Sequence, residues 1–249
     1  MKYYIFSLSI ILLSNFIKSE NYDSIISDFD QYIEQSISKA NIAGMGISIL
    51  AKDSVIFNKG YGLSDIKNKK PFTSNTIMNI ASISKTFIGV AIMNLVERKK
   101  VRLDDDINQF LPFHVYNPHR PDSIITLRHL MSHASGIIDE YKIYSTYYNY
   151  GDDSPVKLET FLKDYLTEDG SLYSQSNFIK NSPGIEFHYS NIGAGLAGYI
   201  VERVSGKPFN IFTKEIIFDP LKMDNTCWFL SEMDRTKHSK IYKSQFFNL

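Results

Sequence analysis

The chain has 249 residues, and its 27 Lys and Arg balance its 27 Asp and Glu, so the formal net charge is zero. Apolar residues make up 43% and charged residues 22%, which is an ordinary globular composition. This length suits one sizeable domain or two small ones. Without a basic field the chain is not expected to bind nucleic acid, and its one cysteine, Cys227, excludes an intrachain disulfide or a multi-cysteine metal site.

The N-terminus predicts a secretory signal peptide. Lys2 gives a positive start, residues 3–13 are mostly apolar, and Ser19 offers a small residue for cleavage. An uncleaved N-terminal anchor is the alternative, although the apolar run is short for a membrane span. We assign residues 1–19 to the signal peptide and residues 20–249 to the folded domain. A secreted or periplasmic product with no membrane span after cleavage is expected, and the sequence does not decide between the two locations.

The first elements of the domain are expected to be a helix and a hairpin. Residues 24–39 predict an amphipathic helix, because apolar residues recur at spacings of three and four. Two β-rich runs follow at residues 45–51 and 54–61, separated by a two-residue turn, and predict a β-hairpin. The second strand is expected to close at Gly60-Tyr61-Gly62, before a Lys-rich turn that contains Ser64.

A serine followed three residues later by a lysine occurs four times, starting at Ser36, Ser64, Ser82 and Ser154. Positions three apart share one face of a helix, and a lysine amine with a lowered pKa can accept the proton of a serine hydroxyl. Only Ser82 opens a long apolar helix, as a nucleophile held on a rigid element requires. The other three lie in polar or Lys-rich stretches or before a proline, and we interpret them as solvated. Ser82 and Lys85 are therefore the candidate nucleophile and proton acceptor.

The middle of the chain predicts short helices. Three aspartates at residues 104–106 are interpreted as the N-terminus of a helical turn, where carboxylates meet the positive end of the helix dipole, rather than as a metal site. Residues 126–136 predict a short helix ended by glycine. His129 and His133 have the spacing of metal ligands. Because no third ligand accompanies them in the sequence, we interpret both as structural.

Residues 138–181 form a polar, tyrosine-rich stretch that is expected to be a helical and loop insertion. Its tyrosines could supply an aromatic wall to a substrate cleft. They could equally pack within a small helical subdomain, and the sequence leaves both alternatives open.

A second constellation of polar residues follows the turn predicted at Pro183-Gly184. Tyr189 and Asn191 lie just before a helix rich in small residues, so their side chains can project into a cleft. The same Y-x-N pattern recurs at residues 147–149 without this frame. The frame, rather than the three-residue pattern, makes Tyr189 and Asn191 candidates.

Taken together, these segments resemble the serine β-lactamase-related family, which includes class C β-lactamases, D-alanyl-D-alanine carboxypeptidases and related esterases. The resemblance spans about residues 24–230 and implies an α/β fold of the β-lactamase/transpeptidase type. Such a fold has an antiparallel sheet with flanking helices and a mostly helical subdomain, here at about residues 100–191. The matching pieces, in order and at plausible separations, are Ala81–Lys85, Leu103–Asp105, Leu130–Gly136 and Pro183–Glu202.

The resemblance also implies roles for the candidate residues. Ser82 would be the acylated nucleophile, and Lys85 would share its proton. Tyr189 would act with Lys85 as general base and then protonate the leaving group, while Asn191 would hydrogen-bond the substrate and the lysine. A phenol, with an ordinary pKa of about 10, becomes a usable base beside a cationic lysine, and the Ser82 backbone N–H at a helix N-terminus suits an oxyanion donor. The expected substrate is a β-lactam, peptide or ester, with no cofactor and no metal, and the oligomeric state is not readable.

One family feature is not found in the sequence. Family members carry a third motif, [HK]-[ST]-G or H-x-G, on a later strand that lines the site and gives a second oxyanion N–H. His238-Ser239-Lys240 lacks the glycine and comes too early, and the last strands of the sheet are expected to be missing. We therefore expect a C-terminally truncated relative that hydrolyses acyl substrates poorly by itself. The alternative is a catalytically impaired relative that serves as a binding or scaffold protein.

Overall fold

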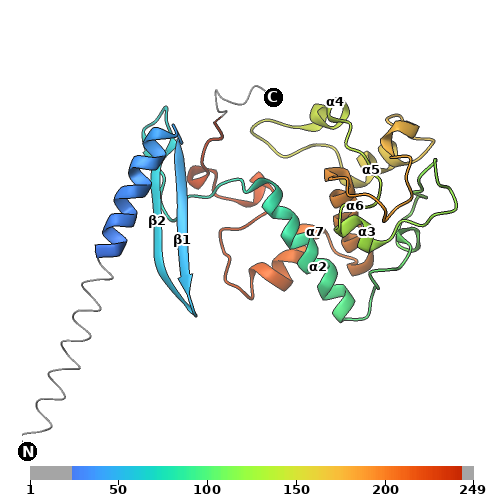
Figure 1. The fold of residues 1–249 in the computed structure, drawn as a ribbon, viewed down its shortest axis with the longest axis horizontal. Helices are drawn as coiled ribbons and strands as arrows, with labels where there is room; N and C mark the ends of the chain where they lie inside the picture. Colours follow the sequence, from blue (N-terminus) through green and yellow to red (C-terminus); the bar gives the residue numbers. More distant parts are fainter. Residues whose placement is uncertain (1–23, 243–249) are drawn as a thin grey trace, which may run out of the picture. The chain divides into compact units, whose positions relative to one another are not determined.

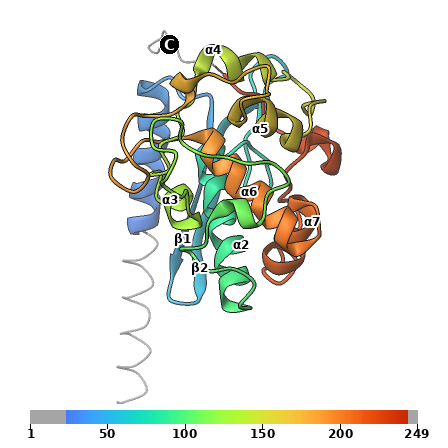
Figure 2. The ribbon, with the colours of Figure 1, turned by 90° about the vertical axis from the view of Figure 1, so that its right-hand side faces the viewer.

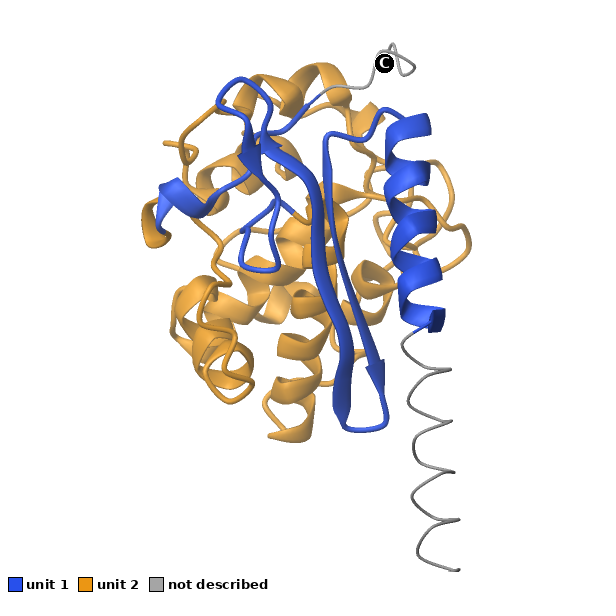
Figure 3. Ribbon diagram, turned by 90° about the vertical axis from the view of Figure 1, so that its left-hand side faces the viewer, with its two compact units in different colours: residues 1–79, 234–249 blue, residues 80–233 orange. Residues whose placement is uncertain are grey.

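The computed structural model describes residues 24–242 and divides the chain into two compact units. One unit comprises residues 1–79 and 234–249 and contains the sheet, and the other comprises residues 80–233 and is helical (Figure 3). The expected signal peptide lies outside the described residues. Between residues 24 and 242, no helix is long and apolar enough to cross a membrane.

The first unit contains the predicted helix and hairpin. The helix occupies residues 24–39 in the described part of the chain, and the hairpin strands lie beside it (Figure 1). The sheet is antiparallel with the order β1-β2-β3. Its strands are β1 (Gly44–Ala51), β2 (Ser54–Asp65) and β3 (Lys70–Pro71), and a short 3₁₀ turn, η7 (Arg235–Lys237), belongs to the same unit.

The helix is attached to the hairpin through every second residue of β2, because strand side chains alternate between the two faces of a sheet. The rings of Phe29 and Phe57 meet edge to face, with centroids 5.4 Å apart. Asp30 then accepts hydrogen bonds from Lys59 Nζ at 2.6 Å and from the Tyr61 hydroxyl at 2.6 Å. Apolar and polar contacts thus fix one face of the hairpin on the helix.

The second strand is longer than the sequence predicted. It continues past Gly60-Tyr61-Gly62 to Asp65, and the turn is confined to residues 66–69. Ser64 is therefore a buried strand residue whose hydroxyl donates to the carbonyl of Pro71 at 3.0 Å, and its interpretation as solvated is wrong. The cause is the pairing with β3, whose Lys and Pro are poor strand formers and give no local signal.

The second unit is built from short helices around two longer ones, α2 and α6. Its elements are η1 (Ala81–Ser84), α2 (Lys85–Glu97), η2 (Ile107–Gln109), α3 (Leu127–Met131), α4 (Tyr141–Tyr144), η3 (Ser145–Tyr147), α5 (Leu158–Leu166), η4 (Gln175–Asn177), α6 (Asn191–Ser205), α7 (Phe209–Thr213), the π-helical turn η5 (Lys214–Phe218) and η6 (Leu230–Glu232).

The core of this unit surrounds α6, which packs against α2, α3, α5 and α7 (Figure 2). Buried residues cover most of the circumference of α6, as is typical of a helix enclosed by others. Its ends carry the expected signals. The Ser190 hydroxyl caps the N-terminus by accepting from Gly193 N, and Gly206 ends the helix in the left-handed conformation. The start of α6 is therefore fixed by the Ser190 cap and by the core that surrounds the helix.

The predicted acidic cap is only partly what the structure shows. Asp106 caps η2 by accepting from Asn108 N at 2.9 Å, as interpreted. Asp104 instead makes a two-point ion pair with Arg128, with oxygen–nitrogen distances of 2.7 and 3.0 Å. The carboxylate of Asp104 therefore links the loop before η2 to α3.

The tyrosine-rich stretch contains both buried and exposed rings. Tyr165 is fully buried, and its hydroxyl donates to the carbonyl of Ile138 at 2.8 Å. The rings of Tyr147 and Phe161 pack with centroids 4.8 Å apart. Tyr150, by contrast, is 95% exposed. Part of the stretch thus packs within the helical unit, and part of it faces solvent.

Candidate active site

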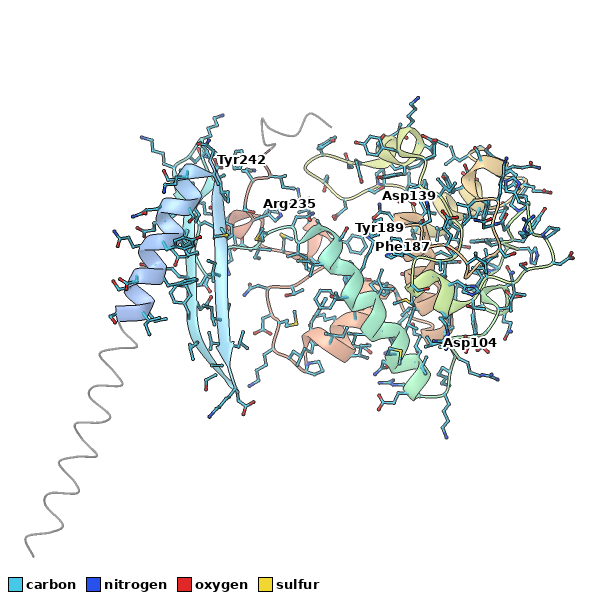
Figure 4. The ribbon with its side chains drawn as sticks, in the orientation of Figure 1. Asp104, Asp139, Phe187, Tyr189, Arg235 and Tyr242 are labelled. Atoms are coloured by element: carbon cyan, nitrogen blue, oxygen red, sulfur yellow. The ribbon has the colours of Figure 1, made fainter. Side chains whose placement is uncertain are left out.

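The four candidate residues come together in the helical unit. The Tyr189 hydroxyl donates to Ser82 Oγ at 2.8 Å, and Lys85 Nζ donates to the same oxygen at 3.1 Å. Lys85 Nζ also donates to Asn191 Oδ1 at 2.7 Å. Figure 4 labels Tyr189, which lies between α2 and α6. A hydroxyl oxygen, an ammonium, a phenol and an amide thus form one connected hydrogen-bond group.

Ser82 lies on a tight turn at the start of the helix rather than within it. It belongs to the 3₁₀ turn η1, and the α-helix proper begins at Lys85. The preceding residue, Ala81, has φ of +46°, a left-handed conformation that costs a non-glycine residue about 1–2 kcal/mol. Strained backbone of this kind clusters at functional sites. The turn places Ser82 about one helical turn before Lys85 and on the same face.

The other three S-x-x-K serines lie outside this group. Ser36 is on the helix of the first unit, and Ser64 is buried in β2 of that unit. Ser154 is exposed, and its hydroxyl accepts from the backbone N–H of Val156 at 3.3 Å. Among the four copies, the structure joins only Ser82 to the Y-x-N segment.

The electrostatics of the group make the phenol of Tyr189 easier to ionise than a free phenol. Hydrogen bonds with Lys85 and then with Ser82 lower the pKa of Tyr189 below its ordinary value, against the opposing effect of burial. The ammonium of Lys85 also lies 5.0 Å from the centroid of the Tyr189 ring. A phenolate stabilised in this way can accept a proton from a neighbouring hydroxyl.

The Y-x-N segment is held by the chain that follows α3. The helix predicted over residues 126–136 is shorter, because α3 ends at Met131. Beyond the end of α3, two backbone carbonyls accept hydrogen bonds from the later segment. Gly184 N donates to the Ala134 carbonyl at 2.7 Å, and His188 N donates to the His133 carbonyl at 2.6 Å. These bonds fix the path of the chain from the Pro183-Gly184 turn to Tyr189.

Replacing Gly184 with alanine is expected to lower the free energy of unfolding by about 1–3 kcal/mol. Gly184 has φ of +89°, and an added Cβ would lie 2.8 Å from His129 Nε2. Gly151→Ala is the matched control, since Gly151 has φ of +88° but an added Cβ there would meet no atom within 4 Å. Urea denaturation of both variants separates the contact from the backbone strain. If the free energy of unfolding falls equally in the two variants, the His129 side chain moves aside for the added Cβ without an energetic cost.

The two histidines both accept hydrogen bonds from backbone N–H groups, and their structural role stays a prediction. The Nδ1 atom of His129 accepts from Thr126 N at 3.3 Å, which helps to cap α3. The Nδ1 atom of His133 accepts from Ser190 N at 3.2 Å, and its ring lies 4.4 Å from the Tyr189 ring between centroids. A ring nitrogen can accept only when it carries no proton. Both contacts therefore require Nδ1 to be unprotonated.

Stability is expected to fall as the pH drops below about 6.5, the ordinary histidine pKa. Burial lowers the pKa of both His129 and His133, so the unfolded chain binds more protons than the folded chain in this range. The contribution of the two neutral histidines to stability is therefore fully present above about pH 6.5. It is lost as the pH falls through their folded-state pKa values. Carboxylates such as Asp104, whose pKa is lowered from 3.8, act at more acid pH.

The measurement is urea unfolding at intervals from about pH 5 to about pH 8. The double variant His129→Gln/His133→Gln should show a smaller pH slope, with the remainder contributed by His238, whose pKa burial also lowers. An unchanged slope in the double variant would contradict the assignment.

One residue of the site was not predicted from the sequence. The carboxylate of Asp139 accepts from the Ser190 hydroxyl at 2.7 Å and from Asn191 N at 2.6 Å. Ser190 is separated from Asp139 by 51 positions in the chain. A local pattern search therefore cannot join them. The available signal was a single aspartate shortly after the Ser135-Gly136 pair, which by itself indicates nothing.

The fold and the site together define a protein of the β-lactamase/transpeptidase type. Residues 29–247 match the family model described as Beta-lactamase, and the chain belongs to that family. The predicted fold, with an antiparallel sheet and flanking helices, is thereby confirmed.

Individual relatives agree with this assignment. The chain is 28% identical over 212 residues to Protein flp of Staphylococcus aureus (strain MRSA252), covering 85% of this chain and 40% of that protein. It is 27% identical over 209 residues to a Beta-lactamase of Yersinia enterocolitica, covering 83% and 48%. The octameric penicillin-binding protein homologue from Pyrococcus abyssi superposes with a TM-score of 0.65 and 27% identity, covering 83% and 45%. The chain thus spans about half the length of these relatives or less.

Proposed function

We propose that the protein is a serine hydrolase that works by acyl transfer, with Ser82 as the nucleophile. The observation that carries the proposal is the joint approach of Tyr189 and Lys85 to Ser82 Oγ, at 2.8 and 3.1 Å. A serine hydroxyl is a weak nucleophile until a neighbouring base takes its proton. Here a phenol with a lowered pKa and a lysine both stand within reach of that proton.

In the proposed reaction, one proton passes from Ser82 Oγ to Tyr189 and then from Tyr189 to the leaving group. With the phenol protonated, Tyr189 donates to Ser82. Once the phenol has lost its proton to solvent, the same hydrogen bond reverses, and Ser82 Oγ passes its proton to the phenolate as it attacks the substrate carbonyl. The Ser82 N–H is the proposed donor to the developing oxyanion, and Tyr189 returns the proton to the departing amine or alcohol. Water then releases the acyl group from Ser82 by the same proton route.

Lys85 and Asn191 keep this exchange in place. The Lys85 ammonium stabilises the phenolate, and its second hydrogen bond, to Asn191 Oδ1 at 2.7 Å, fixes its direction. The amide nitrogen of Asn191 then remains as a donor for a substrate carbonyl. The proposed substrate is a small molecule or peptide with an acyl group: a β-lactam, a peptide or an ester. The N-terminal sequence further supports a secreted or periplasmic location.

Covalent labelling tests the proposal. The protein is incubated with a fluorophosphonate, a penicillin or a p-nitrophenyl ester, and the intact mass is followed with time. One acyl or phosphonyl group per chain is expected, mapped to the peptide that contains Ser82. Binding of the penicillin without any covalent adduct would instead favour a binding protein that keeps the site and does not react.

A further inference from the structure

The carboxylate of Asp139 holds three consecutive residues at the start of α6. One oxygen accepts from the Ser190 hydroxyl at 2.7 Å and from Ile192 N at 3.1 Å, and the other accepts from Asn191 N at 2.6 Å. Ser190 Oγ in turn accepts from Gly193 N at 2.8 Å. The first N–H groups of a helix have no partner within the helix, and a carboxylate there also meets the positive end of the helix dipole. Asp139 therefore anchors the helix from outside it.

The anchor is itself held by the core of the unit. Ile137 is fully buried, and its neighbour Ile138 donates its N–H to the Asn177 carbonyl at 2.8 Å. The Ile138 carbonyl accepts from the hydroxyl of buried Tyr165 at 2.8 Å. The backbone just before Asp139 is thus fixed on both sides, so the carboxylate has a set position.

The anchored residue lies between two residues of the proposed site. Ser190 is preceded by Tyr189, whose hydroxyl reaches Ser82, and is followed by Asn191, whose amide reaches Lys85. Figure 4 labels Asp139 and Tyr189 together. A shift of the backbone at Ser190 would move both side chains at once, and a misplacement of about 1 Å can slow a reaction about 10²-fold.

We infer that Asp139 is a positioning residue of the proposed acyl-transfer site, because it holds the segment that carries Tyr189 and Asn191. The inference rests on the proposed function. Asp139 does not touch Ser82 Oγ in the hydrogen-bond group described for residues 24–242. Its effect on the reaction is transmitted through the backbone of the Y-x-N segment.

The negative charge of Asp139 offers a competing explanation for its effect on the site. This explanation predicts a change in the pKa of Tyr189 of the opposite sign. The ionised groups and rings that face the Tyr189 phenol are Lys85, His133 and Asp139. The negative charge of Asp139 raises the pKa of Tyr189, whereas contact with Lys85 lowers it. Removing the charge alone would lower the pKa of the phenol. Loss of position would break the contact with Lys85 and raise it.

The first experiment compares labelling rates of Ser82 by a fluorophosphonate in the full chain. Asp139→Ala is expected to slow labelling about 10- to 100-fold, and Asp139→Asn, which retains one acceptor oxygen, is expected to slow it less. Asp153→Ala is the matched control, because Asp153 accepts from Leu230 N and Ser231 N in a similar way. The control should keep the labelling rate even if it lowers the melting temperature. Unchanged labelling of folded Asp139→Ala would overturn the inference.

A double-mutant cycle separates positioning from general loss of structure. If Asp139 acts through Tyr189, Asp139→Ala should slow the Tyr189→Phe variant by less than it slows the unchanged protein. If Asp139→Ala slows the Tyr189→Phe variant by the same factor as it slows the unchanged protein, the inference is overturned. Circular dichroism of each variant establishes that the compared chains are folded.

The second experiment needs no activity. The phenol of Tyr189 is titrated by tyrosine-ring ¹³C NMR and assigned by its absence in Tyr189→Phe. Asp139→Ala should raise the pKa of Tyr189, and a lower or unchanged pKa would overturn the inference. If the unchanged protein is not labelled at Ser82, the proposed function fails, and this titration still decides whether Asp139 positions the phenol.

Discussion

Replacing Ser82 with alanine is expected to abolish covalent labelling by fluorophosphonates and penicillins. Ser82 Oγ is the expected attacking atom, because the Lys85 ammonium and the Tyr189 phenol both hydrogen-bond to it. Its removal leaves the phenol and the ammonium without an attacking atom between them. Labelling is followed by in-gel fluorescence and by intact mass, and no adduct is expected after times that saturate the unchanged protein.

Ser84→Ala is the matched control for this loss. Ser84 lies two positions further along the same 3₁₀ turn, so its replacement makes a similar change in local composition. It should be labelled at nearly the rate of the unchanged protein. Persistent labelling of Ser82→Ala would direct the search to another serine and would end the assignment of Ser82.

The sequence selected the four residues that the structure brings into one hydrogen-bond group, but it did not predict every element around them. Ser82 and Tyr189 are 107 positions apart, and no local pattern connects them. Each was selected because of its frame, an apolar helix after Ser82 and a turn with a small-residue helix around Tyr189. These frames are local, so they can be read from the chain, and the family resemblance supplied the long-range pairing.

The missed features depend on contacts that local composition does not reveal. Asp139 contacts Ser190, which is 51 positions away, and Ser64 is buried because a two-residue strand about seven residues further on pairs with β2. The local composition around Ser64, rich in lysine, predicts a solvated turn. Tertiary pairing overrides such a local preference, because buried backbone groups must find hydrogen-bond partners. The composition of the segment alone gives no signal for that pairing.

Replacing Tyr189 with phenylalanine, or Lys85 with methionine, is expected to slow acylation of Ser82 by roughly 10²–10⁴-fold, the usual contribution of a positioned general base. The phenol and the ammonium act as one unit, since hydrogen bonding with Lys85 is the largest cause of the lowered pKa of Tyr189. The double variant should therefore be little slower than the slower single variant, because groups that act as a unit are strongly non-additive.

The pH dependence gives the sharper test of this pair. In the unchanged protein the acylation rate should rise with pH and level off below about 10, the ordinary pKa of a phenol. Lys85→Met removes the cation that stabilises the phenolate, so the rise should move to higher pH. Tyr189→Phe should remove the rise. Tyr116→Phe is the matched control, because the Tyr116 hydroxyl donates to Glu168 at 2.6 Å and belongs to another contact. A Tyr189→Phe variant with the rate and pH profile of the unchanged protein would show that Lys85 alone takes the proton.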